Sequence, residues 1–202
     1  MSIARLLRPA VLAFLSCAVA SELTPHREYV GPSFARSLQR TLDRATKGMA
    51  FSIPTLSPFQ PDSIPGTVFL LTNVPFFVAG ARLMKHAQFA FGTSLGVAGT
   101  LSHTYHHTQL SKGGEEPETA LALLADYGGA ASATAGTARA VAARGGVAFL
   151  AAQRTMSACF AVGAVSFVGG WFTDPKRPEQ YLWLHGVWHV CTAAAVYQLA
   201  AL

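Results

Sequence analysis

Apolar and polar segments alternate along the chain from residue 66 to residue 202. An α-helix needs about 20 apolar residues to cross the core of a bilayer, so apolar stretches of this length predict membrane spans. The sequence predicts five such stretches, at 66–81, 88–107, 118–137, 146–172 and 181–201. The sequence Gly92-x-x-x-Gly96 in the second stretch is typical of helices that pack closely in lipid. The pattern therefore predicts an all-α fold, a polytopic transmembrane helical bundle of about five spans.

The fourth stretch, 146–172, contains Arg154, whose charge is costly at membrane depth. We interpret this stretch as one long, tilted helix in which Arg154 extends toward the membrane surface or pairs within the bundle. The alternative is a pair of separate spans at 137–153 and 155–172.

The first 20 residues differ from the rest of the chain. Arg5 and Arg8 precede an apolar run from Val11 to Ala20, a pattern typical of a signal peptide or an organellar presequence. If the run is retained, it forms a short anchor in the membrane and raises the number of spans to six.

The sequence of residues 21–65 predicts a basic arm followed by a proline-rich linker. Within 33–48, apolar residues near helical spacing are surrounded by arginine and lysine, which predicts a basic amphipathic helix on a membrane or partner surface. A solvated helix is the alternative. The linker contains Pro54, Pro58, Pro61 and Pro65, which favour an extended chain. The predicted parts are thus 1–20, 21–65 and 66–202.

The composition supports the membrane interpretation. Hydrophobic residues make up 51% of the chain and charged residues only 12%, about half of the roughly 25% that is usual in a soluble domain. This balance argues against a soluble enzyme, a coiled coil or a disordered tail. The net charge of +5 does not indicate nucleic-acid binding, because no basic run is interleaved with aromatic residues. Cys17, Cys159 and Cys191 lie far apart in apolar stretches and are interpreted as packing residues.

Several ionisable side chains lie inside the predicted spans, where such residues are functional candidates by default. Ser102 and His106 end the second span, Asp126 lies in the third, and His185 and His189 open the fifth. The spacing of four residues places Ser102 with His106, and His185 with His189, on one face of each helix. If 146–172 is a single span, the order of the helices brings all of these residues to one side of the membrane.

Three imidazoles that leave one position open are typical of a catalytic zinc site, in which a water molecule becomes a nucleophile near neutral pH. His106, His185 and His189 are the candidate ligands. Asp126 could accept a proton from the water or orient it, and Ser102 could bind the water or a substrate oxygen.

Two other interpretations of the histidines stay open. Paired histidines from separate helices can bind haem, and histidines in a membrane can simply form hydrogen bonds between helices. His103 and His107 could also form an alternative pair with His106.

The three motifs together resemble the CREST superfamily of membrane hydrolases, which includes alkaline ceramidases, progestin/adipoQ receptors and the branch of myomaker and the transmembrane-protein-8 group. Ser102-His-Thr-Tyr-His106 is similar to Ser-x-x-Tyr-His of that branch, and Asp126-Tyr-Gly-Gly to its Asp-aromatic-x-Gly. Tyr181-Leu-Trp-Leu-His185-Gly-Val-Trp-His189 is similar to its Tyr-x-x-x-His-Ser-x-Trp-His.

The resemblance implies that His106, His185 and His189 bind zinc, with Ser102 and Asp126 beside the metal-bound water. It also implies hydrolysis of an amide or ester bond in a lipid. The family has seven spans, whereas this chain predicts five, so the resemblance implies a trimmed and divergent member.

The sequence thus predicts two alternative functions for an integral membrane protein in contact with lipids. The first is a zinc-dependent hydrolase of a lipid amide or ester. The second is a non-catalytic accessory subunit of a larger mitochondrial or plastid membrane complex, bound to other membrane-protein subunits. The presequence-like N-terminus and the basic arm favour the second function. The mitochondrial inner membrane and the endomembrane system both stay open as locations.

Overall fold

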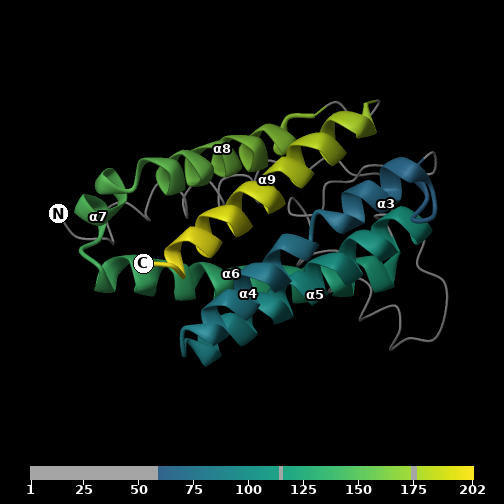
Figure 1. The fold of residues 1–202 in the computed structure, drawn as a ribbon. Coiled ribbons are helices and arrows are strands. Elements are labelled where there is room, and N and C mark those ends of the chain that lie inside the picture. The colour runs from purple at the N-terminus through teal and green to yellow at the C-terminus, as the bar shows by residue number, and fades with distance from the viewer. Residues whose placement is uncertain (1–58, 114–115, 174–176) are drawn as a thin grey trace. The chain divides into compact units, whose positions relative to one another are not determined.

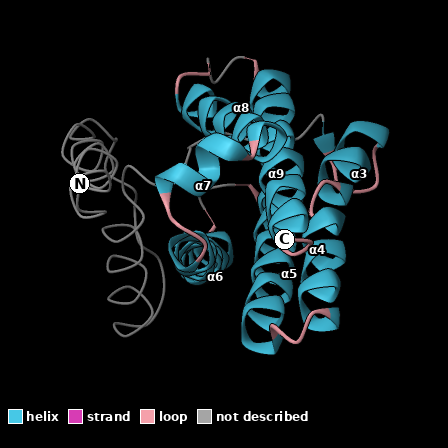
Figure 2. Ribbon diagram, turned by 60° about the vertical axis from the view of Figure 1, so that its left-hand side comes forward, coloured by secondary structure: helices cyan, strands magenta, loops and turns pink. Residues whose placement is uncertain are grey.

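The computed structural model describes residues 59–113, 116–173 and 177–202, which form helices joined by short loops and contain no strand (Figures 1 and 2). The predicted all-α class is confirmed for this part of the chain. The predictions for the N-terminal segment, for the amphipathic helix and for most of the linker lie outside the described residues.

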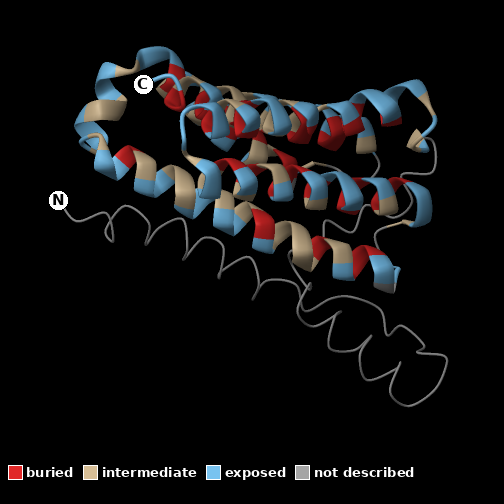
Figure 3. Ribbon diagram, turned by 60° about the horizontal axis from the view of Figure 1, so that its bottom comes forward, coloured by how far each residue is buried: buried red, intermediate tan, exposed pale blue. Residues whose placement is uncertain are grey.

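The helices are α3 (Ile64–Leu71), α4 (Val74–Lys85), α5 (Phe89–Lys112), α6 (Pro117–Ala143), α7 (Val147–Ala152), α8 (Arg154–Trp171) and α9 (Pro178–Leu199). In the described part, α5 packs against α4 and α6, and α9 packs against α4 and α8. Buried positions form stripes along the helices, and the opposite faces are exposed (Figure 3).

The first predicted span consists of two helices, because the chain leaves the helical path after Leu71 and resumes it at Val74. The first of them, α3, begins earlier than the sequence predicts. Ser63 caps it by accepting a hydrogen bond from the backbone N–H of Gly66 at 3.1 Å. Pro65 lies in the first turn, where the missing N–H of proline costs nothing. The prediction that Pro65 belongs to an extended linker is therefore wrong.

The prediction of one long helix over 146–172 is also wrong. Gly145 and Gly146 adopt positive φ angles of 109° and 63° after α6 ends, and Gln153 leaves the helical conformation between α7 and α8. The Ser157 hydroxyl bridges this break by donating to the Leu150 carbonyl at 2.7 Å. Arg154 is thus the exposed first residue of α8 rather than a charge within an apolar helix.

Close contact between α4 and α5 depends on two glycines. A Cβ atom added to Gly92 would lie 2.6 Å from the Gly80 carbonyl oxygen, and one added to Gly80 would lie 2.8 Å from the Gly92 oxygen. A Cβ added to Gly96 would meet nothing within 4 Å, so only Gly92 of the predicted glycine pair requires its missing side chain. The core at this crossing consists of Ala79, Leu83, Leu95, Val196 and Ala200.

Among the described residues, one segment is long and apolar enough to cross a membrane, namely Ile64–Lys85, which comprises α3 and α4. The spans predicted for the remaining helices are not established by this criterion, because polar residues interrupt or end these helices.

Candidate functional site

Three buried histidines meet between α5 and α9. His106 comes from α5, and His185 and His189 come from α9. Their potential ligand atoms all lie within 4.8 Å of one another, and their ring centroids are 4.7–5.2 Å apart. Relative exposure is 0% for His106, 6% for His185 and 0% for His189. Nitrogens about 2.0–2.1 Å from one tetrahedral zinc ion stand roughly 3.3 Å apart, so the three rings could hold a single ion after closing in on it slightly.

The backbone of α9 positions its two histidines in two ways. Their spacing of four residues places both rings on the face that packs against the rest of the bundle. Between them, Gly186 allows α9 to approach the junction of α3 and α4, because a Cβ at this position would lie 3.1 Å from the methyl group of Thr72.

Hydrogen bonds determine which ring nitrogen carries the proton in two of the histidines. Nδ1 of His106 lies 3.0 Å from Oε1 of Gln109, and an amide oxygen only accepts, so this nitrogen donates. Thr72 donates its hydroxyl proton to the Phe69 carbonyl at 2.6 Å and therefore accepts from Nδ1 of His189 at 3.0 Å. Both rings thus keep Nε2 unprotonated, as a metal ligand requires.

Two of these rings have a buried nitrogen without a partner. Within the described part of the chain, Nε2 of His106 and Nε2 of His185 make no hydrogen bond. A buried polar atom without a partner is costly and usually marks a missing ion, water or ligand. Nε2 of His189 has only a long contact of 3.4 Å with the Ser102 hydroxyl.

Ser102 lies beside the histidines and connects Asp126 to them. Ser102 is buried on α5, one turn before His106, and its hydroxyl lies within hydrogen-bonding reach of Asp126 on α6 as well as of His189. The hydroxyl has one proton, which it can donate to either group. Asp126 also interacts electrostatically with Tyr105 and Tyr181.

Aromatic rings enclose the histidines and hold their orientation. The Phe69 ring lies 4.7 Å from His106 and stacks on His189 at 6.1 Å. On α9, Trp188 contacts both histidines of its own helix, at 4.8 Å and 5.1 Å. Further contacts come from Tyr105, Tyr181, Phe76 and Phe167. With these rings around them the histidines are almost fully buried, and electrostatic interactions are stronger in such surroundings than in water.

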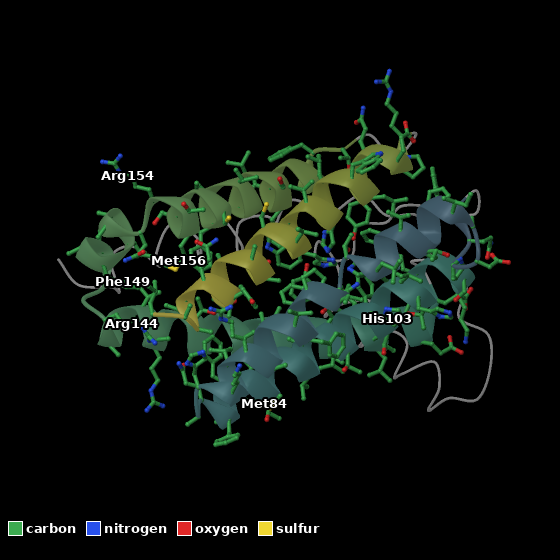
Figure 4. The ribbon with its side chains drawn as sticks, in the orientation of Figure 1. Met84, His103, Arg144, Phe149, Arg154 and Met156 are labelled. Atoms are coloured by element: carbon green, nitrogen blue, oxygen red, sulfur yellow. The ribbon has the colours of Figure 1, made fainter. Side chains whose placement is uncertain are left out.

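The structure brings together all five residues that the sequence predicts for the site: Ser102, His106, Asp126, His185 and His189. The structure does not bring the alternative candidates, His103 and His107, into this cluster. His103 and His107 stack on each other at 6.4 Å on the exposed face of α5, where Figure 4 labels His103.

The sequence interpretation missed Gln109 and Thr72. Gln109 lies three residues after His106, so helical spacing could have indicated it. Thr72 carried no such signal, because it acts from the break between α3 and α4, which the pattern did not predict.

Comparisons of the chain with protein-family models, curated proteins and solved structures give no match. The CREST resemblance therefore rests on the three sequence motifs.

Proposed function

We propose that this chain is an integral membrane protein whose His106, His185 and His189 bind Zn²⁺ and that it hydrolyses an amide or ester bond of a lipid. The observation that carries the proposal is the convergence of three buried imidazoles, two of which have a buried Nε2 without a partner. Three neutral nitrogen ligands with room for a fourth are the usual donor set of catalytic zinc. When bound, zinc would supply a Lewis acid and would activate water as a nucleophile near neutral pH.

The side chains around the histidines have separate roles in this reaction. Asp126 accepts the proton that water loses as its oxygen bonds to the carbonyl carbon. It then returns this proton to the leaving nitrogen or oxygen as the C–N or C–O bond breaks. Ser102 positions Asp126, or donates to the carbonyl oxygen of the substrate as negative charge develops there.

An apolar groove next to the histidines supports a lipid as the substrate. It has a volume of about 290 Å³, runs between α3 and α9, and is lined mainly by apolar side chains, among them Val68, Phe69, Trp183, Val187 and Val190. Phe69 forms part of the groove wall and also contacts His106. A hydrocarbon chain in the groove would therefore be separated from His106 by the Phe69 ring.

Exposed apolar side chains support placing the other helices in the bilayer as well. Val162, Val165 and Val168 face outward from α8, with 49%, 74% and 46% exposure, and Trp183 on α9 is 71% exposed. A soluble protein rarely leaves so many large apolar residues uncovered, whereas lipid tails would cover them. Helices of a neighbouring subunit would cover α8 equally well, so the same exposed residues also fit the accessory-subunit function, which is the alternative.

Metal analysis of the purified chain tests the proposal. We expect close to one zinc per chain in the wild type and in His103→Ala, and loss of zinc in His106→Ala. The two variants remove a histidine from the same helix, so they differ only in the face that they alter. Absence of zinc from the wild type, or equal zinc in the two variants, would contradict the site. Zinc without turnover of any lipid amide or ester would favour the accessory subunit.

A further inference from the structure

The charged residues of the described chain are divided unequally between the two ends of the bundle. One end is formed by the last turns of α4 and α6, the junction of α7 with α8, and the C-terminal end of α9 (Figure 1). We call this the basic end, because it carries Arg82, Lys85, Arg139, Arg144 and Arg154. The described acidic residues, which are Asp62, Glu116, Glu118, Asp126 and Glu179, lie in or near the opposite half.

The cations of the basic end have no carboxylate partner among the described residues. The ion pair that the described residues do form lies at the opposite end of the bundle, where Nζ of Lys112 is 3.4 Å from Oε1 of Glu118. Arg144 donates to the Ala140 carbonyl of its own helix, and Arg154 extends away from the bundle (Figure 4). Nε of Arg82 is buried without a hydrogen-bond partner. The basic end therefore presents several positive charges that nothing in the described part neutralises.

Aromatic and apolar residues lie beside these cations. The Arg82 guanidinium is stacked on the Tyr197 ring, with Cζ 4.0 Å from the ring centroid. Met84 and Phe89, next to it along the chain, are 39% and 65% exposed. Arg82 and Lys85 also lie in the last turn of the segment that is long and apolar enough to cross a membrane. Lysine, arginine and tyrosine beside apolar residues are typical of the headgroup layer of a membrane.

We propose that the basic end binds the phosphate groups of anionic phospholipids in the leaflet that it faces. An acidic protein partner would fit the charges, but it would leave Met84 and Phe89 uncovered, whereas a lipid supplies phosphate and hydrocarbon at adjacent depths. This inference rests on the proposed placement in the membrane and is independent of the proposed zinc chemistry.

Thermal unfolding of the detergent-solubilised full chain, titrated with phosphatidylglycerol or with phosphatidylcholine, tests the inference. The variant Lys85→Gln/Arg139→Gln removes two exposed charges from the basic end, and the control Lys112→Gln/Arg177→Gln removes two from the opposite end. We expect phosphatidylglycerol, and not phosphatidylcholine, to raise the melting temperature of the wild type and the control. The apparent affinity of the first variant for phosphatidylglycerol should be roughly 10–30-fold lower than that of the wild type, because each basic residue contributes to binding an anionic surface. High salt should weaken the effect.

The inference is wrong if the two variants respond alike, if phosphatidylcholine acts as well as phosphatidylglycerol, or if inorganic phosphate alone reproduces the shift. Lipid adducts counted by native mass spectrometry give a second readout that does not depend on unfolding. Zinc measured in the same samples separates the two proposals. If the chain retains zinc but does not distinguish the two lipids, only the proposal of phospholipid binding at the basic end is rejected. Release of the chain from membranes by alkaline carbonate would reject the membrane placement and this inference with it.

Discussion

At the scale of single residues, two hydrogen bonds decide which nitrogen of each imidazole can bind a metal ion. Gln109 fixes the tautomer of His106, and Thr72 fixes that of His189. We expect Gln109→Leu to weaken zinc binding by about 10–100-fold, because it leaves Nδ1 of His106 buried without an acceptor. Gln109→Glu keeps an acceptor and should retain most of the affinity. Competition with a chromogenic chelator measures both variants, and equal affinities would show that Gln109 does not orient the ring.

The roles proposed for Asp126 and His185 also differ at this scale. His185→Ala should lose zinc because it removes a ligand. Asp126→Asn should keep zinc and lose hydrolysis by roughly 10²–10⁴-fold, because an amide cannot accept the proton of the attacking water. Zinc content and turnover of lipid amides and esters are measured on the same preparations. If Asp126→Asn retains full activity, the carboxylate has no part in proton transfer and serves only to connect α6 to α5.

The composition of the site was predictable because its residues obey helical spacing. Four-residue intervals placed Ser102 with His106 and His185 with His189. The meeting of these pairs with Asp126 was predicted only on the condition of a single helix over 146–172, and the residues meet although the structure divides that stretch into α7 and α8. The neighbours that orient the rings were less accessible to the same reasoning. Thr72 acts from the junction of α3 and α4, far from the histidines in the sequence. Its hydroxyl donates to the Phe69 carbonyl and is left to accept from His189.

At the scale of elements, the crossing of α4 and α5 depends on the absence of side chains at two positions. Gly92→Leu should destabilise the fold by about 1–3 kcal/mol, because its Cβ alone would collide with the Gly80 carbonyl and push the helices apart. Gly96→Ala is the matched control on the same helix, since its Cβ meets nothing within 4 Å, and it should be neutral or slightly stabilising. Unfolding of both variants in the same detergent, followed by circular dichroism, measures the difference. Equal stabilities would show that the crossing can relax.

Hydropathy located the apolar elements but not their breaks. The pattern merged α3 with α4 and α7 with α8, because an average over apolar residues does not register the backbone angles of single residues such as Gln153. Arg154 was the single sequence signal of the second break, since a charge is more easily placed at the first turn of a helix than within it.

At the scale of the whole molecule, a bound ion would join segments that are far apart in the sequence. His106 lies on α5 and His185 and His189 on α9, so an ion held by all three would bind the folded chain and not the unfolded one. Such a ligand stabilises the fold by about 4 kcal/mol when its free concentration is 1,000 times its Kd. For a chain of this size that corresponds to a melting temperature higher by on the order of 10 °C.

We therefore expect a strong chelator to lower the melting temperature of the wild type, and stoichiometric zinc to restore it. Asp126→Asn should respond to the chelator as the wild type does, because the carboxylate is not proposed as a ligand. His185→Ala should melt early with or without chelator, because it has no ion to lose.

The accessory-subunit function predicts another pattern, in which the histidines only pack between helices. The chelator would then not change the melting temperature of the wild type, and both variants would melt early for lack of a packing contact. Melting curves of the three proteins with and without chelator distinguish the two patterns, and indifference of the wild type to the chelator would replace the hydrolase with the accessory subunit.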